Sequence, residues 1–309
     1  MDKIATREAY GDEIAELGQA DSRIYVIDCD IGKSCKTTKF KDRFSKQYIN
    51  VGIAEQNACG IAAGLALMGK IPFITSYAVF GSMRMCEQIR QSVCYPYLNV
   101  KIACSHGGVT PANDGATHQC TEDMGILRTI PNMTVVMGAD YYATRALVRI
   151  AAKHNGPVYL RFTRDDVPVI YSENDVFEIG KAKLLHDGYD LTIIANGDMV
   201  SIAIEAYNVL KANGVSIRLL DMHTIKPLDI EAVRAAVRDT GKIITVEDHS
   251  VINGLGSAVC EIAADAGGCI VKRIGIQDCF GESAPYQELL IKNGISSDNI
   301  INLALNMVK

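Results

Sequence analysis

The chain has 309 residues, 48% of them hydrophobic and 22% charged, which is enough for two globular domains that each bury a core. Its net charge of −5 is spread along the chain without a basic block, and this excludes a polyanionic partner such as nucleic acid on electrostatic grounds. No apolar run approaches the roughly 20 residues that cross a bilayer, and the start of the chain lacks the apolar core of a secretory signal, so we expect a cytoplasmic protein.

Short runs rich in Val and Ile alternate along the chain with longer segments of helical period, a pattern typical of βαβ units around a parallel sheet. In the first half the predicted strands are RIYVIDCDI, IPFITSY, NVKIACSH, MTVVMGAD and PVYLRFTR. A polar stretch from Asp165 to Asp190 then interrupts the pattern and is the candidate linker. In the second half the predicted strands are DLTIIANGD, VSIRLLDMHTI, KIITVEDHS and VKRIGIQD. We therefore predict two consecutive α/β domains, residues 1–175 and 176–309.

The second predicted domain has well-marked helices but no obvious chemical motif. Asp198 is placed to cap the helix MVSIAIEAYNVLKAN, and Asp229 is placed to cap the helix that follows the next strand. His223 and His249 lie near strand ends, and we interpret both as structural. We expect this domain to support assembly.

In the first domain, the segment YINVGIAEQNACGIAAGLALMGKIPF predicts a turn followed by a helix rich in Gly and Ala. The glycines inside this helix cost roughly 1 kcal/mol each, so we expect a second element to pack closely against the helix in compensation. Glu55 begins this helix, where an acid is also favoured simply by the helix dipole. Tyr77 and Phe80 follow the strand IPFITSY, and from the pattern alone they could be ordinary core aromatics.

The most specific stretch is SHGGVTPANDGATHQCTED, which follows the predicted strand NVKIAC. His106 therefore lies just beyond the carboxyl end of a strand, where open α/β sheets bind their ligands. The remainder is a polar, Gly-rich loop of the kind that carries function. It places Asp114 between His106 and His118, a combination that an ordinary solvated loop does not require.

Metal binding is an alternative for this loop, because His and Asp are common ligands. Spacings of eight and then four residues fit no standard zinc signature. The ten cysteines occur singly, without a CxxC pair, and are expected to be free. We therefore expect no metal site on this chain.

VGIAEQ with its Gly/Ala-rich helix, the aromatic pair in SYAVFGSMR and the pattern H-x7-DGxTHQxxED together resemble the transketolase family of thiamine-diphosphate enzymes. The resemblance runs from about Arg7 to the end of the chain and corresponds to the second and third domains of a full-length transketolase. It implies an α/β fold with a pyrimidine-binding domain followed by the transketolase C-terminal domain. The implied activity is transfer of a two-carbon ketol unit between sugar phosphates, as in the pentose phosphate pathway.

The resemblance also implies a cofactor site. The family glutamate that matches Glu55 shares a proton with a ring nitrogen of the aminopyrimidine, which favours the imino tautomer that activates the thiazolium carbon. Tyr77 and Phe80 match the aromatic residues that pack on the pyrimidine ring. Asp30 lies in a loop that is expected to border the cofactor.

The implied substrate site begins in the histidine-containing loop. His106 and Asp114 match family residues that face the substrate's hydroxyls, and His118 matches one that handles protons at the reacting carbonyl. The sequence has Ala112 and Asn113 where the family commonly has Gly and Glu, so the fine substrate preference stays open.

A second part of the implied substrate site is a set of phosphate-binding residues. Arg7, Ser34 and Arg161 align with family residues that bind the substrate's phosphate, a role suited to arginine forks and a hydroxyl. Arg164 is a close competitor for the role given to Arg161.

The family holds the cofactor's diphosphate on a separate domain, whose GDG motif binds a divalent metal. This chain contains Gly197-Asp198-Met199 but no GDG. The resemblance therefore implies a partner, an N-terminal transketolase subunit that holds the diphosphate and Mg²⁺ (or Ca²⁺), and no activity without it. The expected assembly is an α2β2 heterotetramer, with the helix after Glu55 in the interface.

Two alternatives stay open. One is the beta subunit of a 2-oxoacid dehydrogenase decarboxylase component, which shares the fold, the glutamate and the need for a partner but resembles this chain less in the histidine-containing loop. The other is a non-catalytic partner subunit, against which the presence of Glu55, His106, Asp114 and His118 together argues.

Overall fold

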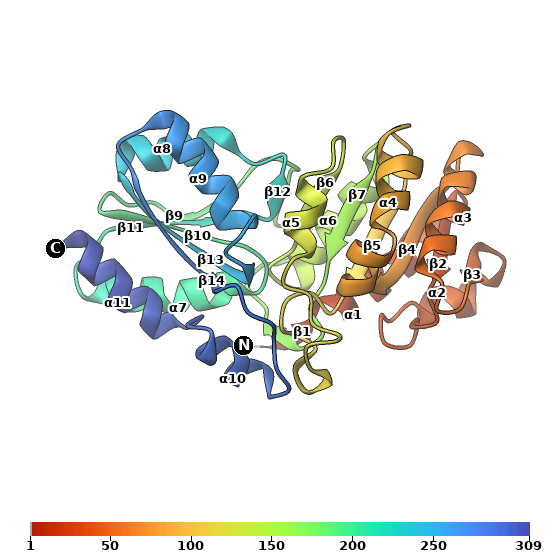
Figure 1. Cartoon of the computed structure of the whole chain (residues 1–309), viewed down its shortest axis with the longest axis horizontal. Coiled ribbons are helices and arrows are strands. Elements are labelled where there is room, and N and C mark those ends of the chain that lie inside the picture. The colour runs from red at the N-terminus through yellow and green to blue at the C-terminus, as the bar shows by residue number, and fades with distance from the viewer. Residues whose placement is uncertain (1) are drawn as a thin grey trace.

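Two α/β domains lie side by side in the computed structural model of this chain, which describes residues 2–309 (Figure 1). The first domain is built on a seven-stranded sheet in the order β12-β6-β7-β5-β4-β2-β3. Its strands are β2 (Ile24–Asp28), β3 (Tyr48–Asn50), β4 (Ile71–Tyr77), β5 (Lys101–Ser105), β6 (Thr134–Met137), β7 (Val158–Arg161) and β12 (Thr224–Lys226). All pairings in this sheet are parallel except that of β12, which comes from the second half of the chain and lies antiparallel to β6.

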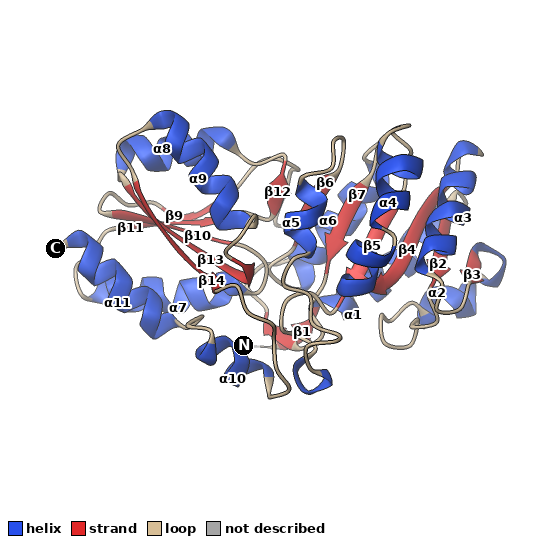
Figure 2. Cartoon of the chain, in the orientation of Figure 1, coloured by secondary structure: helices blue, strands red, loops and turns tan. Residues whose placement is uncertain are grey.

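Both faces of this sheet are buried, as continuous Val/Ile-rich strands predict. Because successive side chains on a strand point to opposite faces, Val26 and Phe73 join one core cluster while Ile27 and Ile74 join the other. Helices α1 (Thr6–Ala20) and α6 (Tyr141–Lys153) pack together on one face (Figure 2). The other elements of the domain are α2 (Thr38–Arg43), α3 (Glu55–Leu67), α4 (Cys86–Gln88), α5 (Asp123–Arg128), and two π-helical turns, Phe80–Arg84 and Ile89–Cys94.

The second domain has a five-stranded sheet in the order β14-β13-β10-β11-β9, in which only the edge strand β9 is antiparallel. Its strands are β9 (Lys183–His186), β10 (Leu191–Ala195), β11 (Ile217–Asp221), β13 (Lys242–Ser250) and β14 (Ile270–Ile276). Its helices are α7 (Met199–Ala212), α8 (Ile230–Asp239), α9 (Leu255–Ala266), α10 (Tyr286–Lys292) and α11 (Ser297–Val308). Helix α7 packs with α11 and helix α8 packs with α9, one pair on each side of the sheet (Figure 1).

Every strand predicted from the sequence is present, which confirms the α/β fold with two mainly parallel sheets. The chain between β8 (Asp166–Pro168), which pairs with β1 (Lys3–Ala5), and β9 contains no helix or strand, and the proposed boundary near residue 175 falls within it. The cap prediction is confirmed for Asp229, whose carboxylate accepts a hydrogen bond from the Ala232 amide at 3.1 Å. It is wrong for Asp198, whose carboxylate bonds the Tyr286 hydroxyl instead of the start of α7.

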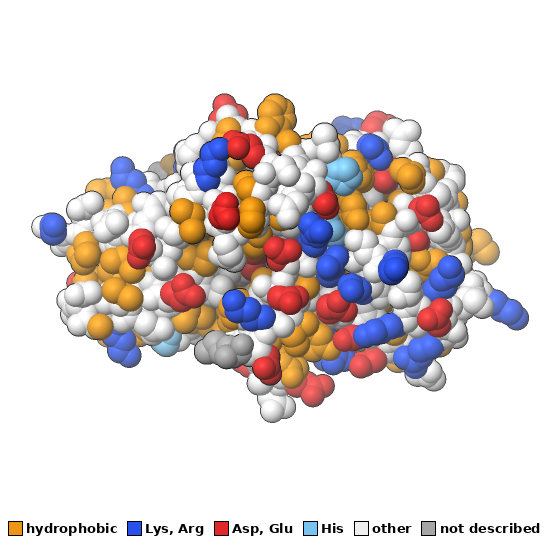
Figure 3. All heavy atoms as spheres, turned by 90° about the horizontal axis from the view of Figure 1, so that it is seen from below, with side chains coloured by type: hydrophobic (Ala, Val, Ile, Leu, Met, Phe, Trp, Pro, Cys, Tyr) orange, Lys and Arg blue, Asp and Glu red, His pale blue; other side chains and the backbone are white. Residues whose placement is uncertain are grey.

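In the view from below, acidic and basic side chains are interspersed (Figure 3). No helix among residues 2–309 is long and apolar enough to cross a membrane. All ten cysteines are free.

Candidate active site

The loops that follow β2, β4 and β5 leave the sheet at the same end, because neighbouring parallel strands have their carboxyl ends on the same side. These loops carry Ser34, Phe80 and His106, while Tyr77 is the last residue of β4. Residues that are far apart in the sequence are thereby brought together at one end of the sheet.

Glu55 is the first residue of α3 and is 4% exposed. Its carboxylate accepts a hydrogen bond from the Ser76 hydroxyl at 3.2 Å and lies 3.4 Å from an Arg84 guanidinium nitrogen. Together with the helix N-terminus, these contacts compensate the cost of burying a carboxylate. Residues 53–57 and Arg84 line an open hollow, so Glu55 borders a space that a ligand from outside the chain can enter. The sequence analysis did not identify Ser76 or Arg84.

Tyr77 and Phe80 are only partly buried, so they are not simply core residues. The Tyr77 ring stacks on His106, with centroids 3.9 Å apart and planes inclined by 29°. The Phe80 ring meets His118 edge-on at 5.6 Å and carries the Arg84 guanidinium 3.9 Å above its centroid. The two aromatic and two histidine side chains therefore form one cluster beside the hollow of Glu55.

His106 is 1% exposed and adopts a left-handed backbone conformation, with φ 66°. Its Nδ1 pairs with the Ser105 hydroxyl at 2.9 Å. Burial lowers the pKa of His106 to about 3, and the nearby cations Arg7 and Arg164 add to the effect. The ring is therefore neutral near pH 7, and it can exchange hydrogen bonds with a ligand but does not act as a cation.

Two arginines approach this cluster. Arg7 donates a hydrogen bond to the Ser34 carbonyl at 3.1 Å, and its Nε is buried without a partner among the described residues. The Ser34 hydroxyl accepts a hydrogen bond from the Tyr77 hydroxyl at 2.9 Å. Arg164 lies 3.5 Å from the carboxylate of the exposed Asp114. Free donor capacity beside His106 suits an anionic group.

Arg161 does not join Arg7 and Arg164 beside the cluster, so the phosphate-binding role that the sequence analysis assigned to Arg161 is not supported. Its side chain is 1% exposed and pairs with the fully buried Asp123 at 3.1 Å. Its guanidinium also donates to the carbonyls of Asp248 at 2.8 Å and Cys120 at 3.3 Å. The reason is that Arg161 is the last residue of a buried strand, whereas Arg164 lies beyond the strand end and is 31% exposed.

Asp30 and His118 are the remaining predicted residues. Asp30 is exposed, and its carboxylate accepts a hydrogen bond from the Asn50 side chain at 2.9 Å. The His118 ring pairs through Nδ1 with the Thr117 hydroxyl at 3.0 Å. Residues 106–123 form the segment that we call the histidine loop.

The residues present fit an aminopyrimidine. A flat heterocycle with a ring nitrogen needs a carboxyl group at its edge and aromatic faces beside it. Glu55 and Arg84 line the hollow, and Arg84 also covers the ring of Phe80, which neighbours Tyr77. A metal has no comparable site, since no group of three His, Cys, Asp or Glu side chains that could hold an ion occurs in residues 2–309.

Comparisons with known proteins agree with this geometry. The family model of the transketolase pyrimidine-binding domain matches residues 2–169, and that of the transketolase C-terminal domain matches residues 180–300. A putative transketolase C-terminal section from Methanocaldococcus jannaschii is 45% identical over 306 residues, covering 98% of this chain and 96% of the relative. Among solved structures, a split gene transketolase described as an inactive beta4 tetramer is 44% identical with a TM-score of 0.91, and 99% of each chain is covered.

Two further relatives have names that include a substrate. A 6-deoxy-6-sulfo-D-fructose transketolase subunit from a Clostridium species is 42% identical and covers 96% of this chain and 92% of the relative. One of the subunits of an apulose-4-phosphate transketolase from Phocaeicola vulgatus is 41% identical and covers 99% of this chain and 98% of the relative.

Proposed function

This chain belongs to the transketolase family, and on that premise we propose that it is the C-terminal subunit of a two-chain, thiamine-diphosphate-dependent transketolase. The observation that carries the proposal is the position of Glu55. It is a buried carboxyl group that opens onto a hollow beside a cluster of Tyr77, Phe80, His106 and His118. The reaction would be transfer of a two-carbon ketol unit from a ketose to an aldose.

Glu55 would hold a proton against the ring nitrogen of the pyrimidine, while Tyr77 and Phe80 pack on the ring and exclude water. Thiamine diphosphate, when bound, supplies the nucleophilic carbon of the reaction. His118 would donate a hydrogen bond to the substrate oxygen on which negative charge develops. The neutral His106 would hydrogen-bond a substrate hydroxyl, and Asp114 would accept one and so read its configuration.

The substrate would carry an anionic tail held by Arg7, Ser34 and Arg164. Arg164 replaces Arg161 in this role because its guanidinium lies on the side of Asp114 and His106. The relatives' names include both a sulfonated and a phosphorylated sugar. Both tails present oxygens of the same geometry to arginine, and we propose a sugar phosphate as the first substrate to test.

A partner chain would hold the diphosphate and its Mg²⁺ (or Ca²⁺). Support comes from α3, where a Cβ added at Gly60 or Gly64 would meet no atom within 4 Å outside the backbone of the helix itself. The close packing that we expected against these glycines is therefore not made by residues 2–309. Ile53, Leu67 and Met68 around this helix are each 74% exposed, which suits a docking face for the partner in an α2β2 assembly.

Reconstitution with the partner tests the proposal. The subunit purified together with its companion chain is assayed with xylulose 5-phosphate and with a 2-oxoacid, side by side. We expect ketol transfer from the sugar phosphate and no decarboxylation. Turnover of the 2-oxoacid alone would support the decarboxylase alternative instead, and no turnover of either substrate by a complex that binds thiamine diphosphate would support a non-catalytic role.

A further inference from the structure

The histidine loop packs against its own domain through buried residues such as Val109, Ala112 and Cys120, but it also makes hydrogen bonds to the second domain. Its base is closed by reciprocal backbone hydrogen bonds between Gly108 and Cys120, of 2.7 and 2.9 Å. Its tip, at Asn113 and Asp114, is exposed. Its backbone is also strained, since His106 and Ala112 are non-glycine residues with positive φ, of 66° and 54°. Such a loop keeps one conformation only if other elements hold it.

The second domain holds the base of the loop through Asp248, near the end of β13. Both carboxylate oxygens of Asp248 lie 3.1 Å from the Val109 amide, which donates to them. Gly108 lies so close to this carboxylate that a Cβ at that position would overlap it. The Tyr286 hydroxyl donates to Asp248 at 3.3 Å and also bonds Asp198. Tyr286 therefore helps to fix the carboxylate, which contacts the loop backbone at Gly108 and Val109, two and three residues after His106.

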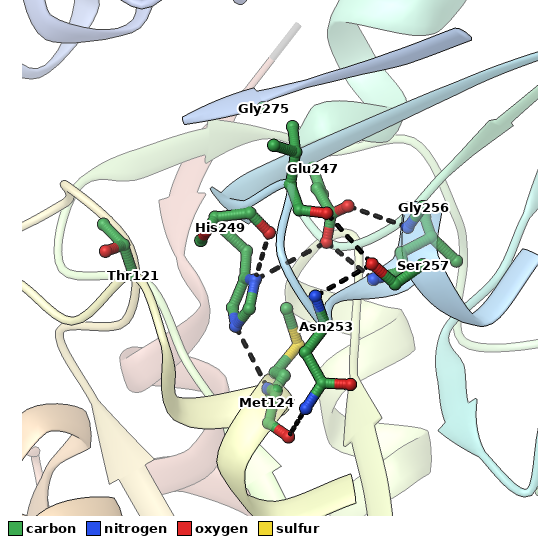
Figure 4. A network of polar contacts seen from close by, with 12 residues as sticks. Thr121, Met124, Glu247, His249, Asn253, Gly256, Ser257 and Gly275 are labelled. Atoms are coloured by element: carbon green, nitrogen blue, oxygen red, sulfur yellow. Dashed lines mark hydrogen bonds and ion pairs between the residues drawn. The ribbon is translucent and has the colours of Figure 1, made fainter. Parts of the chain in front are cut away.

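Residues after Asp248 hold the far end of the loop (Figure 4). The Ser250 amide donates to the Thr121 carbonyl at 2.7 Å. His249 accepts a hydrogen bond through Nε2 from the Gly125 amide at 3.1 Å and donates through Nδ1 to the Ser250 carbonyl at 2.7 Å. Both ring nitrogens of His249 are thus used by backbone groups, which assigns it a role at the junction of the two domains.

The tip of the loop contacts a third segment of the second domain, residues 277–285 after β14. The Ser283 hydroxyl donates to the Asn113 carbonyl at 2.6 Å. The Gln119 side chain donates to the Glu282 carbonyl at 2.7 Å, and Gly281 leaves room for that side chain. The sequence analysis missed this segment, although GESAP is a polar, Gly-containing stretch a few residues after a strand.

We propose that the second domain is the template that positions the histidine loop, and that Asp248 is its main positioning residue. The inference rests on the proposed function, because it assigns His106, Asp114 and His118 to the substrate. Asp248 touches no substrate; it fixes the Gly108–Val109 backbone, and through it the direction of the His106 side chain. A displacement of about 1 Å in such a loop costs on the order of 100-fold in rate.

Asp248→Ala in the assembled two-chain enzyme tests this proposal against a matched control. Asp221→Asn changes an equally buried carboxyl group at the end of β11, whose hydrogen bond goes to the Tyr171 hydroxyl at 2.8 Å. The readouts are amide hydrogen exchange across residues 106–120, kcat and KM for the sugar phosphate, and the Kd of thiamine diphosphate by calorimetry. Hydrogen exchange and the Kd need no turnover.

For Asp248→Ala we expect exchange in the loop at least about tenfold faster, kcat about 10- to 100-fold lower, and an unchanged cofactor Kd. Asp248→Asn keeps one oxygen for the Val109 amide, so its loop exchange and its kcat should both lie closer to those of the wild type. It serves as the test variant if Asp248→Ala does not fold. Asp221→Asn should leave the loop and kcat unchanged. Equal acceleration of loop exchange by the Asp248 and Asp221 variants, or an Asp248 variant with normal exchange and kcat, would overturn the proposal. Failure of the proposed function would instead appear as a wild-type complex without ketol transfer, whatever the exchange data show.

Discussion

The hollow beside Glu55 and the junction between the two domains both contain buried charged side chains, but these side chains differ in how far they are enclosed by protein. In the hollow, the Glu55 carboxylate contacts one hydroxyl, that of Ser76, and the half-exposed Arg84. At the junction, Arg161 and Asp123 pair with each other and with neighbouring polar groups, although Arg161 Nε and Asp123 Oδ1 have no hydrogen-bond partner among the described residues. Glu55 borders a hollow that a ligand can enter, whereas the Arg161–Asp123 ion pair is enclosed by protein, and this difference in access separates a candidate binding site from a structural ion pair. Charge and residue type alone do not distinguish the two.

The largest expected effect comes from the hollow. Glu55→Gln keeps the size of the side chain but removes the shared proton, so the reconstituted enzyme should lose on the order of 10³-fold in kcat. The fold should be retained, as judged by an unchanged far-ultraviolet circular dichroism spectrum. Glu173→Gln, at an exposed linker position, is the control. Retention of full ketol transfer by the Glu55 variant would show that the proposed mechanism is wrong.

At the junction, Arg161→Met should act on stability. The substitution leaves Asp123 buried at 0% exposure without its ion-pair partner, which costs about 3–5 kcal/mol of unfolding free energy. Denaturant titration of the isolated subunit measures it. A loss below about 1 kcal/mol, comparable with an exposed ion pair, would contradict the role given to this arginine.

Arg164→Met, three residues further on, should raise KM and leave stability nearly unchanged, the reverse of what we expect for Arg161→Met. Loss of a charge-assisted hydrogen bond to an anionic tail costs about 1.5–3 kcal/mol, which corresponds to roughly a 10- to 100-fold higher KM for the sugar phosphate. The free energy of unfolding should change by no more than about 0.5 kcal/mol, because the side chain is 31% exposed. If KM stayed constant and stability fell, the assignments of Arg161 and Arg164 would have to be exchanged.

The smallest effect concerns pH. The pKa of His106 is lowered to about 3 in the folded protein, whereas an unfolded histidine titrates near 6.5. The unfolded state therefore binds more protons between these values, so the stability contributed by neutral His106 is complete above about pH 6.5 and is lost as the pH falls towards 3. Relative to His106→Asn, which tolerates the left-handed backbone, the wild type should lose on the order of 2 kcal/mol between pH 7.5 and pH 5. An equal pH dependence in the two proteins would show that His106 titrates normally.

The sequence predicted what local pattern determines. Strand positions followed from runs of Val and Ile, Glu55 from the start of a Gly/Ala-rich helix, and the histidine loop from its place after β5. It did not predict what depends on distant packing. PVYLRFTR contains two arginines, and only the position of the strand end shows that one faces the core. Asp248 and residues 277–285 meet the histidine loop only because the two domains touch, which no local pattern encodes.

The central claim is that the catalytic site is divided between two polypeptides. It is tested most directly by supplying the purified subunit with thiamine diphosphate, magnesium and xylulose 5-phosphate plus an acceptor aldose, with and without the companion chain. The account predicts no turnover when this chain is alone and ketol transfer when the companion is added. Turnover at a comparable rate without the companion would contradict it.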